Sequence, residues 1–167
     1  ARACYGGVFV EGICVMGLFP FIAAFLASLG EPRPSIAGLV IAGFPIGGLV
    51  YTSTVSRVLP RIGVQGMIIG GGALMASQLA AITLGPPWQL QFVCFLVMGC
   101  GFYMLHGSLQ TFASEISIEA RGTAVAMHAF CFFLGQTVGP IAYGLGLAHA
   151  AKTVTLLVAA MMMFLLG

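Results

Sequence analysis

The sequence is short of charge. It contains six basic and four acidic residues in 167, and none of the acidic residues is aspartate. Charged residues make up 6% of the chain, whereas a typical soluble domain carries roughly 25%, so they cannot cover a water-facing surface. The net charge of +2 leaves no strongly basic face for nucleic acid. The composition therefore argues against an ordinary soluble domain and against a nucleic-acid-binding protein.

Cysteine spacings typical of metal sites are also absent. The five cysteines all fall inside apolar runs, without a CxxC pair and without a Cys/His spacing suited to zinc. Cysteines in such positions act as small apolar packing residues. We therefore expect no metal site and no cofactor. The five residues are Cys4, Cys14, Cys94, Cys100 and Cys131.

Hydrophobic residues make up 60% of the chain, and they are gathered in long runs. A helix needs about 20 apolar residues to cross a bilayer. Charges, prolines and glycines separate the runs, as in Glu31-Pro32-Arg33-Pro34 and Gly85-Pro86-Pro87-Trp88, because proline fits the start of a helix better than its interior. The pattern predicts an all-α membrane protein with six transmembrane helices at about 4–29, 35–57, 63–84, 88–114, 121–148 and 152–167.

The loop charges predict an orientation. Four arginines fall on one side of the predicted bundle and two basic residues on the other, and basic loops favour the cytoplasm. Both ends of the chain are then expected in the cytoplasm, with a bacterial inner membrane as the expected location. The four are Arg2, Arg57, Arg61 and Arg121, and the two are Arg33 and Lys152.

The first residues of the chain predict that it is part of a longer protein. The chain opens at Ala1 and its first methionine is Met16, which is typical of a piece of a longer protein. The first apolar run is too long for the hydrophobic region of a signal peptide.

Polar residues within the predicted helices form stripes. At 100° per residue, Tyr103, His106 and Gln110 lie within about 80° of one another on 88–114, and His128 and Gln136 share an arc on 121–148. With a rise of 1.5 Å per residue, Glu11 and both histidines lie at one depth. Such groups are expensive in lipid and usually face a cavity or a partner. The six residues are a predicted substrate or proton pathway: Glu11, Tyr103, His106, Gln110, His128 and Gln136. A helix–helix hydrogen bond is the competing interpretation for the histidines, and contact with interfacial water for Glu11.

A second set of charges follows the predicted helices on the cytoplasmic side. Charge-assisted pairs there could hold one conformation closed and break in another. Ordinary topology-setting charge is the alternative. The predicted cytoplasmic gate consists of Arg57, Arg61, Glu115, Glu119 and Arg121.

Glycines and prolines cluster in the second and fifth predicted helices. Small residues let helix backbones approach closely in lipid. Both helices combine glycine, proline and a later tyrosine, which hints at a repeat of three plus three helices. The predicted packing and bending positions are Gly47, Gly48, Gly135, Gly139 and Pro140.

Two segments resemble the major facilitator superfamily. Residues 47–63, with Arg57 and Arg61, are similar to the basic loop after the second helix of each six-helix half, although the usual acidic residue is missing and the spacing is stretched. Residues 109–140 look like the junction of the fourth and fifth helices, with an acidic residue, Arg121-Gly122 and a glycine-rich fifth helix. Gly135-x-x-x-Gly139-Pro140 is reminiscent of the antiporter motif, which belongs to the other half.

The resemblance implies the C-terminal half of a twelve-helix transporter, built as a 3+3 inverted repeat. Segments 4–29 and 88–114 would line the central cavity, and 35–57 and 121–148 would face the N-terminal six-helix half of the same polypeptide. The implied function is secondary active transport of a small organic solute by alternating access, with proton-coupled efflux. The implied partners are lipid, the other half, the solute and protons.

Two other classes stay open at this point. A channel or structural membrane subunit could share the polar stripes. A rhomboid-like serine protease needs a serine beside a histidine base, and Ser108 lies close to His106 in the sequence. However, the helix count places them about 160° apart, and the Gly-x-Ser-Gly pattern does not occur. We therefore expect no enzyme.

Overall fold

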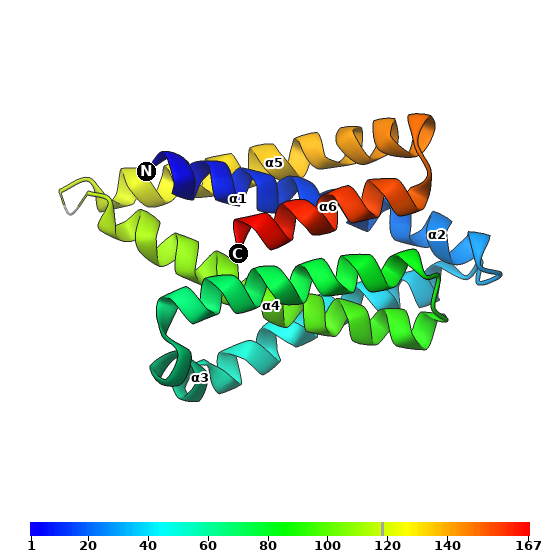
Figure 1. The fold of residues 1–167 in the computed structure, drawn as a ribbon, viewed down its shortest axis with the longest axis horizontal. Coiled ribbons are helices and arrows are strands. Elements are labelled where there is room, and N and C mark those ends of the chain that lie inside the picture. The colour runs from blue at the N-terminus through cyan, green and yellow to red at the C-terminus, as the bar shows by residue number, and fades with distance from the viewer. Residues whose placement is uncertain (118) are drawn as a thin grey trace.

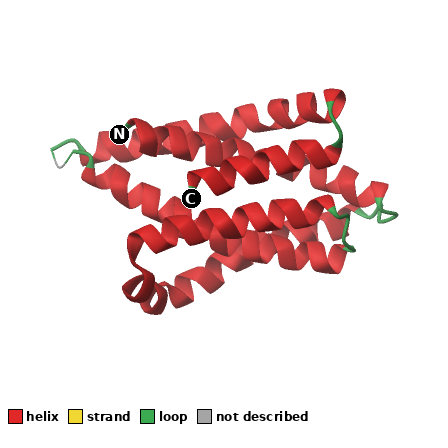
Figure 2. Ribbon diagram, in the orientation of Figure 1, coloured by secondary structure: helices red, strands yellow, loops and turns green. Residues whose placement is uncertain are grey.

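The structure is a computed structural model that describes residues 1–117 and 119–167. Within these residues all regular structure is helical, and no strand occurs (Figure 2). The helices run roughly side by side along the long axis of the molecule (Figure 1). The elements are α1 (Arg2–Cys14), the 3₁₀ helix η1 (Met16–Phe21), α2 (Ile22–Ser28), α3 (Pro34–Thr83), α4 (Trp88–Glu115), α5 (Arg121–His149) and α6 (Lys152–Leu166).

The first apolar run folds as an interrupted helix. α1 and α2 are separated by η1, which contains Pro20. Proline lacks the backbone N–H of a helix and its ring collides with the preceding turn, so the helix tightens locally to the 3₁₀ form. The predicted single helix 4–29 is therefore three consecutive pieces along one rod.

The expectation of six separate helices is wrong in one place. The predicted break between residues 57 and 63 does not end the helix, because helical hydrogen bonding continues through Pro60 and α3 runs from Pro34 to Thr83. The chain does turn at the end of that range, at Gly63, whose φ of 67° and ψ of 176° suit a residue without a side chain. Within the described residues the structure thus has five helical stretches, counting Arg2–Ser28 as one.

The turn at Gly63 folds α3 into two arms that both pack on α4. Gly47 in the first arm lies against the Leu96 carbonyl, and Gly71 in the second arm lies against Gly101. The first arm runs parallel to α4 and the second arm antiparallel to it, as Figure 1 shows. The second arm also contacts the end of α6, where Gly72 meets Gly167.

A second close packing joins the front of the chain to α5. A Cβ atom built on Gly12 would lie 2.5 Å from the Phe132 carbonyl, and Gly17 lies against Gly139. Both positions advance together along the two helices, so α1 and η1 run parallel to α5. Of the predicted packing residues, Gly47, Gly48, Gly135 and Gly139 all sit at close contacts, whereas Pro140 lies within a continuous α5.

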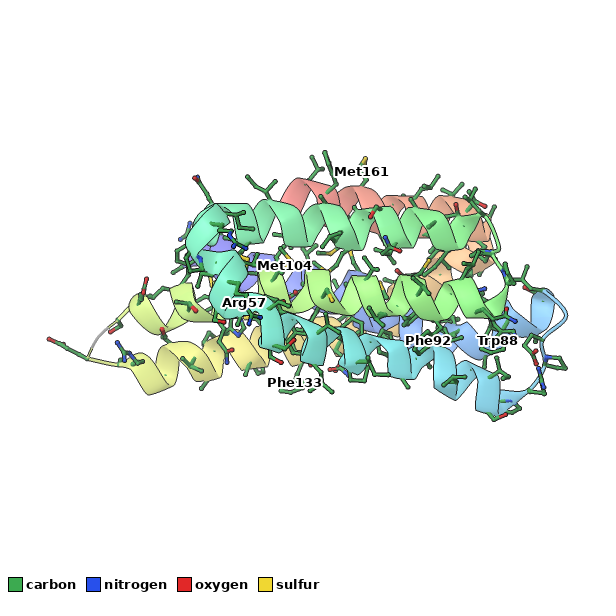
Figure 3. All side chains as sticks on the ribbon, turned by 90° about the horizontal axis from the view of Figure 1, so that it is seen from below. Arg57, Trp88, Phe92, Met104, Phe133 and Met161 are labelled. Atoms are coloured by element: carbon green, nitrogen blue, oxygen red, sulfur yellow. The ribbon has the colours of Figure 1, made fainter. Side chains whose placement is uncertain are left out.

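The outside of the bundle is apolar. Four stretches are long and apolar enough to cross a membrane: Arg2–Ser28, Pro34–Thr83, Trp88–Glu115 and Arg121–His149, and the shorter Lys152–Leu166 is apolar as well. Large side chains point outwards from them, including Phe133 and Met161 in Figure 3. A surface of this kind is stable in lipid and not in water. The chain is a multi-pass membrane protein.

Candidate functional site

A carboxylate and an imidazole meet in the centre of the bundle. Glu11 of α1 is 0% exposed, and its Oε2 atom lies 2.8 Å from Nδ1 of His106 on α4. The His106 side chain is 19% exposed, so the imidazole lies between the buried carboxylate and the outside. A carboxylate sealed from water requires a partner of this kind, because an unpaired charge in a low-dielectric interior is very costly.

His128 brings a third helix to the same place. It lies on α5, is 1% exposed, and its ring centroid is 5.0 Å from that of His106 with the rings nearly perpendicular. The sequence placed Glu11, His106 and His128 at one depth, and the structure brings them together from three helices. Their role in transport stays a prediction.

Two atoms of this cluster have no hydrogen-bond partner. They are Oε1 of Glu11 and Nε2 of His128, and both are buried. A buried polar atom without a partner costs about 1–3 kcal/mol. The cluster therefore has one satisfied contact and two unused hydrogen-bonding positions. The described residues include no group of three or more metal-ligating side chains suited to a metal ion.

Aromatic rings surround His106, and the sequence analysis missed them. Phe102 stacks on the imidazole with centroids 4.9 Å apart and an angle of 15°, and Phe132 approaches edge-on at 4.9 Å. Both rings could have been found from the sequence, because Phe102 precedes His106 by four residues and Phe132 follows His128 by four, the spacing of neighbours on a helix face. They shield the Glu11–His106 contact from water.

Among the described residues, the other three members of the predicted pathway make no hydrogen bond with this cluster. Tyr103 is half-buried and packs its ring on Gly48, while Gln110 and Gln136 are exposed. That these residues share faces with the histidines stays a prediction from the helix count. It could not say which part of each face is covered by a neighbouring helix.

The predicted gate is not assembled in this structure. Arg57, Arg61, Glu115 and Glu119 are exposed, and no ion pair joins them among the described residues. Arg121 instead donates from Nε to the Ser114 carbonyl at 3.1 Å. This contact ties the start of α5 to the end of α4.

An ion pair is present at the opposite end of the molecule. Arg33 binds both carboxylate oxygens of Glu31 at 2.7 and 2.6 Å. The guanidinium beside it lowers the pKa of the Glu31 carboxyl below its ordinary value. Both residues lie between α2 and α3, outside the apolar stretches.

One comparison with known proteins identifies a relative. The chain is 30% identical over 135 residues to the "Uncharacterized MFS-type transporter YfkF" of Bacillus subtilis (strain 168). The match covers 80% of this chain and 34% of the relative, so the chain spans about a third of the relative's length. This similarity supports membership of the major facilitator superfamily. No protein-family model matches the chain, and no solved structure matches it.

The geometry gives no support to a serine protease. The Ser108 hydroxyl donates to the Met104 carbonyl of its own helix at 2.8 Å, so it is not directed at an imidazole. Tyr143 likewise has a structural contact, since its hydroxyl donates to the Cys14 carbonyl at 2.7 Å.

Proposed function

We propose that this chain is the C-terminal half of a secondary active transporter of the major facilitator superfamily. It moves a small organic solute by alternating access and couples solute efflux to proton entry. The similarity to an MFS-type transporter supports the transport class. The observation that carries the proton coupling is the fully buried Glu11 carboxylate held by His106 across two helices.

The chemistry of this pair explains why it suits proton coupling. Imidazole is the side chain that changes charge near physiological pH, and a carboxylate buried in a membrane protein is a frequent proton carrier. When both groups are charged they attract each other across α1 and α4. Adding a proton to the carboxylate, or removing one from the imidazole, weakens that attraction and lets the helices separate.

The uncovered faces of the bundle supply the place for a second half. The first arm of α3 and the outer face of α5 carry large exposed side chains, with Leu49 at 70% and Phe130 and Ile141 near 60% exposed. In the proposed transporter these faces meet the N-terminal six-helix half. Rocking of the two halves would then expose the pathway first to one side of the membrane and then to the other.

We assign a role in gating to the charged residues of the predicted cytoplasmic gate. Arg57 and Arg61 at the turn of α3, together with Glu115, Glu119 and Arg121, form contacts with the other half in the state that is closed to the cytoplasm. Both ends of the chain lie in the cytoplasm, in accordance with the arginine bias of that side.

The test uses the full-length protein in liposomes that contain a pH-sensitive dye. A panel of small organic solutes is added under an imposed pH gradient, and proton movement driven by each solute is recorded. We expect at least one solute to move protons through the wild type and not through Glu11→Gln. Glu31→Gln is the matched control, because it makes the same chemical change in an exposed loop and leaves coupled transport intact.

Two results would reject the proposal. Undiminished proton-coupled transport by Glu11→Gln would remove the carboxylate from the coupling mechanism. Solute flux without counterflow exchange would indicate a channel, which is the alternative function.

A further inference from the structure

The buried imidazole of His128 takes no part in the proposed proton exchange between Glu11 and His106. Its Nε2 atom has no partner although the side chain is 1% exposed. A nitrogen buried without a partner destabilises the fold, so simple packing would favour an apolar residue there. The structure keeps this imidazole beside His106, with ring centroids 5.0 Å apart.

The Glu11 carboxylate also has an oxygen without a hydrogen-bond partner. Its Oε2 atom contacts His106, whereas Oε1 is buried and free. A carboxylate can serve two partners at once because each oxygen accepts separately. One oxygen is thus engaged with α4, and the other is available to a donor or acceptor from another helix.

His106 contacts both of the other side chains in the cluster. Its Nδ1 atom lies 2.8 Å from Oε2 of Glu11, and its ring centroid lies 5.0 Å from that of His128. Gly12 packs at the Phe132 carbonyl, and His128 lies one turn before Phe132 on the parallel helix α5. Backbone contacts at Gly12 and Gly135 hold the two helices too close for a large side chain to come between them.

Other titratable groups near this end of the cluster are already engaged or lie further along. Tyr5 of α1 donates its hydroxyl to the Ala124 carbonyl, and the Cys4 thiol donates to the Leu109 carbonyl on α4. Cys131 lies one turn along α5 from His128, and Tyr103 one turn before His106 on α4. None of these four carries a charge in its ordinary state at neutral pH.

We propose a proton relay in which Glu11 carries a proton from His106 to His128. The relay deepens the proposed function and rests on it for its role in transport. Protonated His106 donates from Nδ1 to Oε2 of Glu11, which leaves a neutral imidazole and a neutral carboxylic acid. The carboxyl group then turns about its Cγ–Cδ bond, a torsion with a broad energy profile.

The turned carboxyl group presents its O–H to Nε2 of His128. Transfer of that proton leaves a carboxylate and a protonated His128, so one proton has moved from α4 to α5 and Glu11 is restored. A small shift of either side chain, or one bridging water, closes the distance to His128. The charge then attracts Glu11 towards α5 in place of α4.

Nuclear magnetic resonance of ¹⁵N-labelled histidines tests the relay without any solute. The full-length protein is placed in nanodiscs, and the signals of His106, His128 and His149 are assigned by single replacement. A shared proton couples the titrations of the groups that share it. Replacing Glu11 by Gln therefore moves the titration midpoints of both His106 and His128. Glu31→Gln moves neither.

The opposite result is equally clear. If Glu11→Gln moves the midpoint of His106 alone, His128 is a packing residue and the relay is wrong. His128→Asn, which keeps a polar side chain, gives a second measurement. Its effect on the His106 midpoint disappears in the Glu11→Gln background if the relay exists, and is unchanged there if the two rings, 5.0 Å apart, act on each other only directly. Absence of proton-coupled transport by the wild type, together with coupled histidine titrations, would reject the proposed function and leave the proton relay. Transport by the wild type with uncoupled titrations would reject the relay alone.

Discussion

The close contact between α1 and α5 predicts that replacing Gly12 by alanine destabilises the fold. A Cβ atom at Gly12 would lie 2.5 Å from the Phe132 carbonyl oxygen and 2.9 Å from the Gln136 nitrogen, whereas ordinary contacts begin at 3.4 Å. Gly12→Ala therefore forces the helices apart by about 0.9 Å at this point, because all the obstructing atoms are backbone. Overpacking of this kind costs about 1–3 kcal/mol.

Gly6 on the same helix provides the matched control. A Cβ atom at Gly6 meets nothing within 4 Å, so Gly6→Ala gains only the better helix propensity of alanine, up to about 1 kcal/mol. The two variants make the same chemical change a few residues apart in α1. Both changes gain the same helix propensity, so we expect the free energies of unfolding to differ by the overpacking cost alone, about 1–3 kcal/mol in favour of Gly6→Ala.

The assay is unfolding in mixed detergent micelles of increasing dodecyl sulfate content, followed by far-ultraviolet circular dichroism. Equal midpoints for the two variants would refute the reasoning, since they would mean that α1 and α5 are not in backbone contact. A lower midpoint for Gly6→Ala would refute it as well.

Three further predictions concern single contacts. Tyr143→Phe leaves the buried Cys14 carbonyl without its hydroxyl donor and should lower the free energy of unfolding by about 1–3 kcal/mol in the same assay. Gly63→Ala meets no atom within 4 Å, but Gly63 holds a φ of 67° and a ψ of 176°, a region essentially restricted to glycine, so the change should cost about 1–3 kcal/mol. The lowered pKa of Glu31 means that its pair with Arg33 stabilises the fold above the ordinary value of 4.5 and is lost as the pH falls below it. Glu31→Gln should therefore match the wild-type unfolding midpoint in acid and fall slightly below it at neutral pH.

The ends of three helices could be predicted from the sequence. The expected segments 88–114, 121–148 and 152–167 agree with α4, α5 and α6 to within a residue. Each of these helices begins next to a proline or a charged residue, Trp88 after two prolines and Arg121 and Lys152 at charges. Such residues are unfavourable in the interior of an apolar helix, so they mark its boundary.

The interior prolines could not be interpreted in the same way. Pro20 accompanies a switch to 3₁₀ geometry, whereas Pro45, Pro60 and Pro140 lie within continuous helices. The difference depends on whether neighbouring groups satisfy the carbonyl that a proline leaves free, and this is a property of the packed bundle. The same limit explains why a break was expected after residue 57, whereas α3 stays helical through Pro60 and turns at Gly63.

The sequence predicted the depth of the site residues in the bundle, but it did not predict which of them are in contact. The rise of a helix fixes how far Glu11, His106 and His128 lie from its end, and this sufficed to place them at one level. Which of them touch depends on the rotation of each helix against its neighbours, and glycines such as Gly12 set that rotation. The exposed positions of Gln110 and Gln136 follow from the same rotation.

The interruption at η1 divides the first rod mechanically. An unbroken helix passes a tilt at one end along its whole length, but here the regular hydrogen-bond ladder stops at Cys14 and resumes at Ile22. Stretches of 3₁₀ within a helix frequently act as hinges. A tilt of the outer segment α2 at Pro20 would therefore leave α1, which packs on α5, and the Glu11 carboxylate in place.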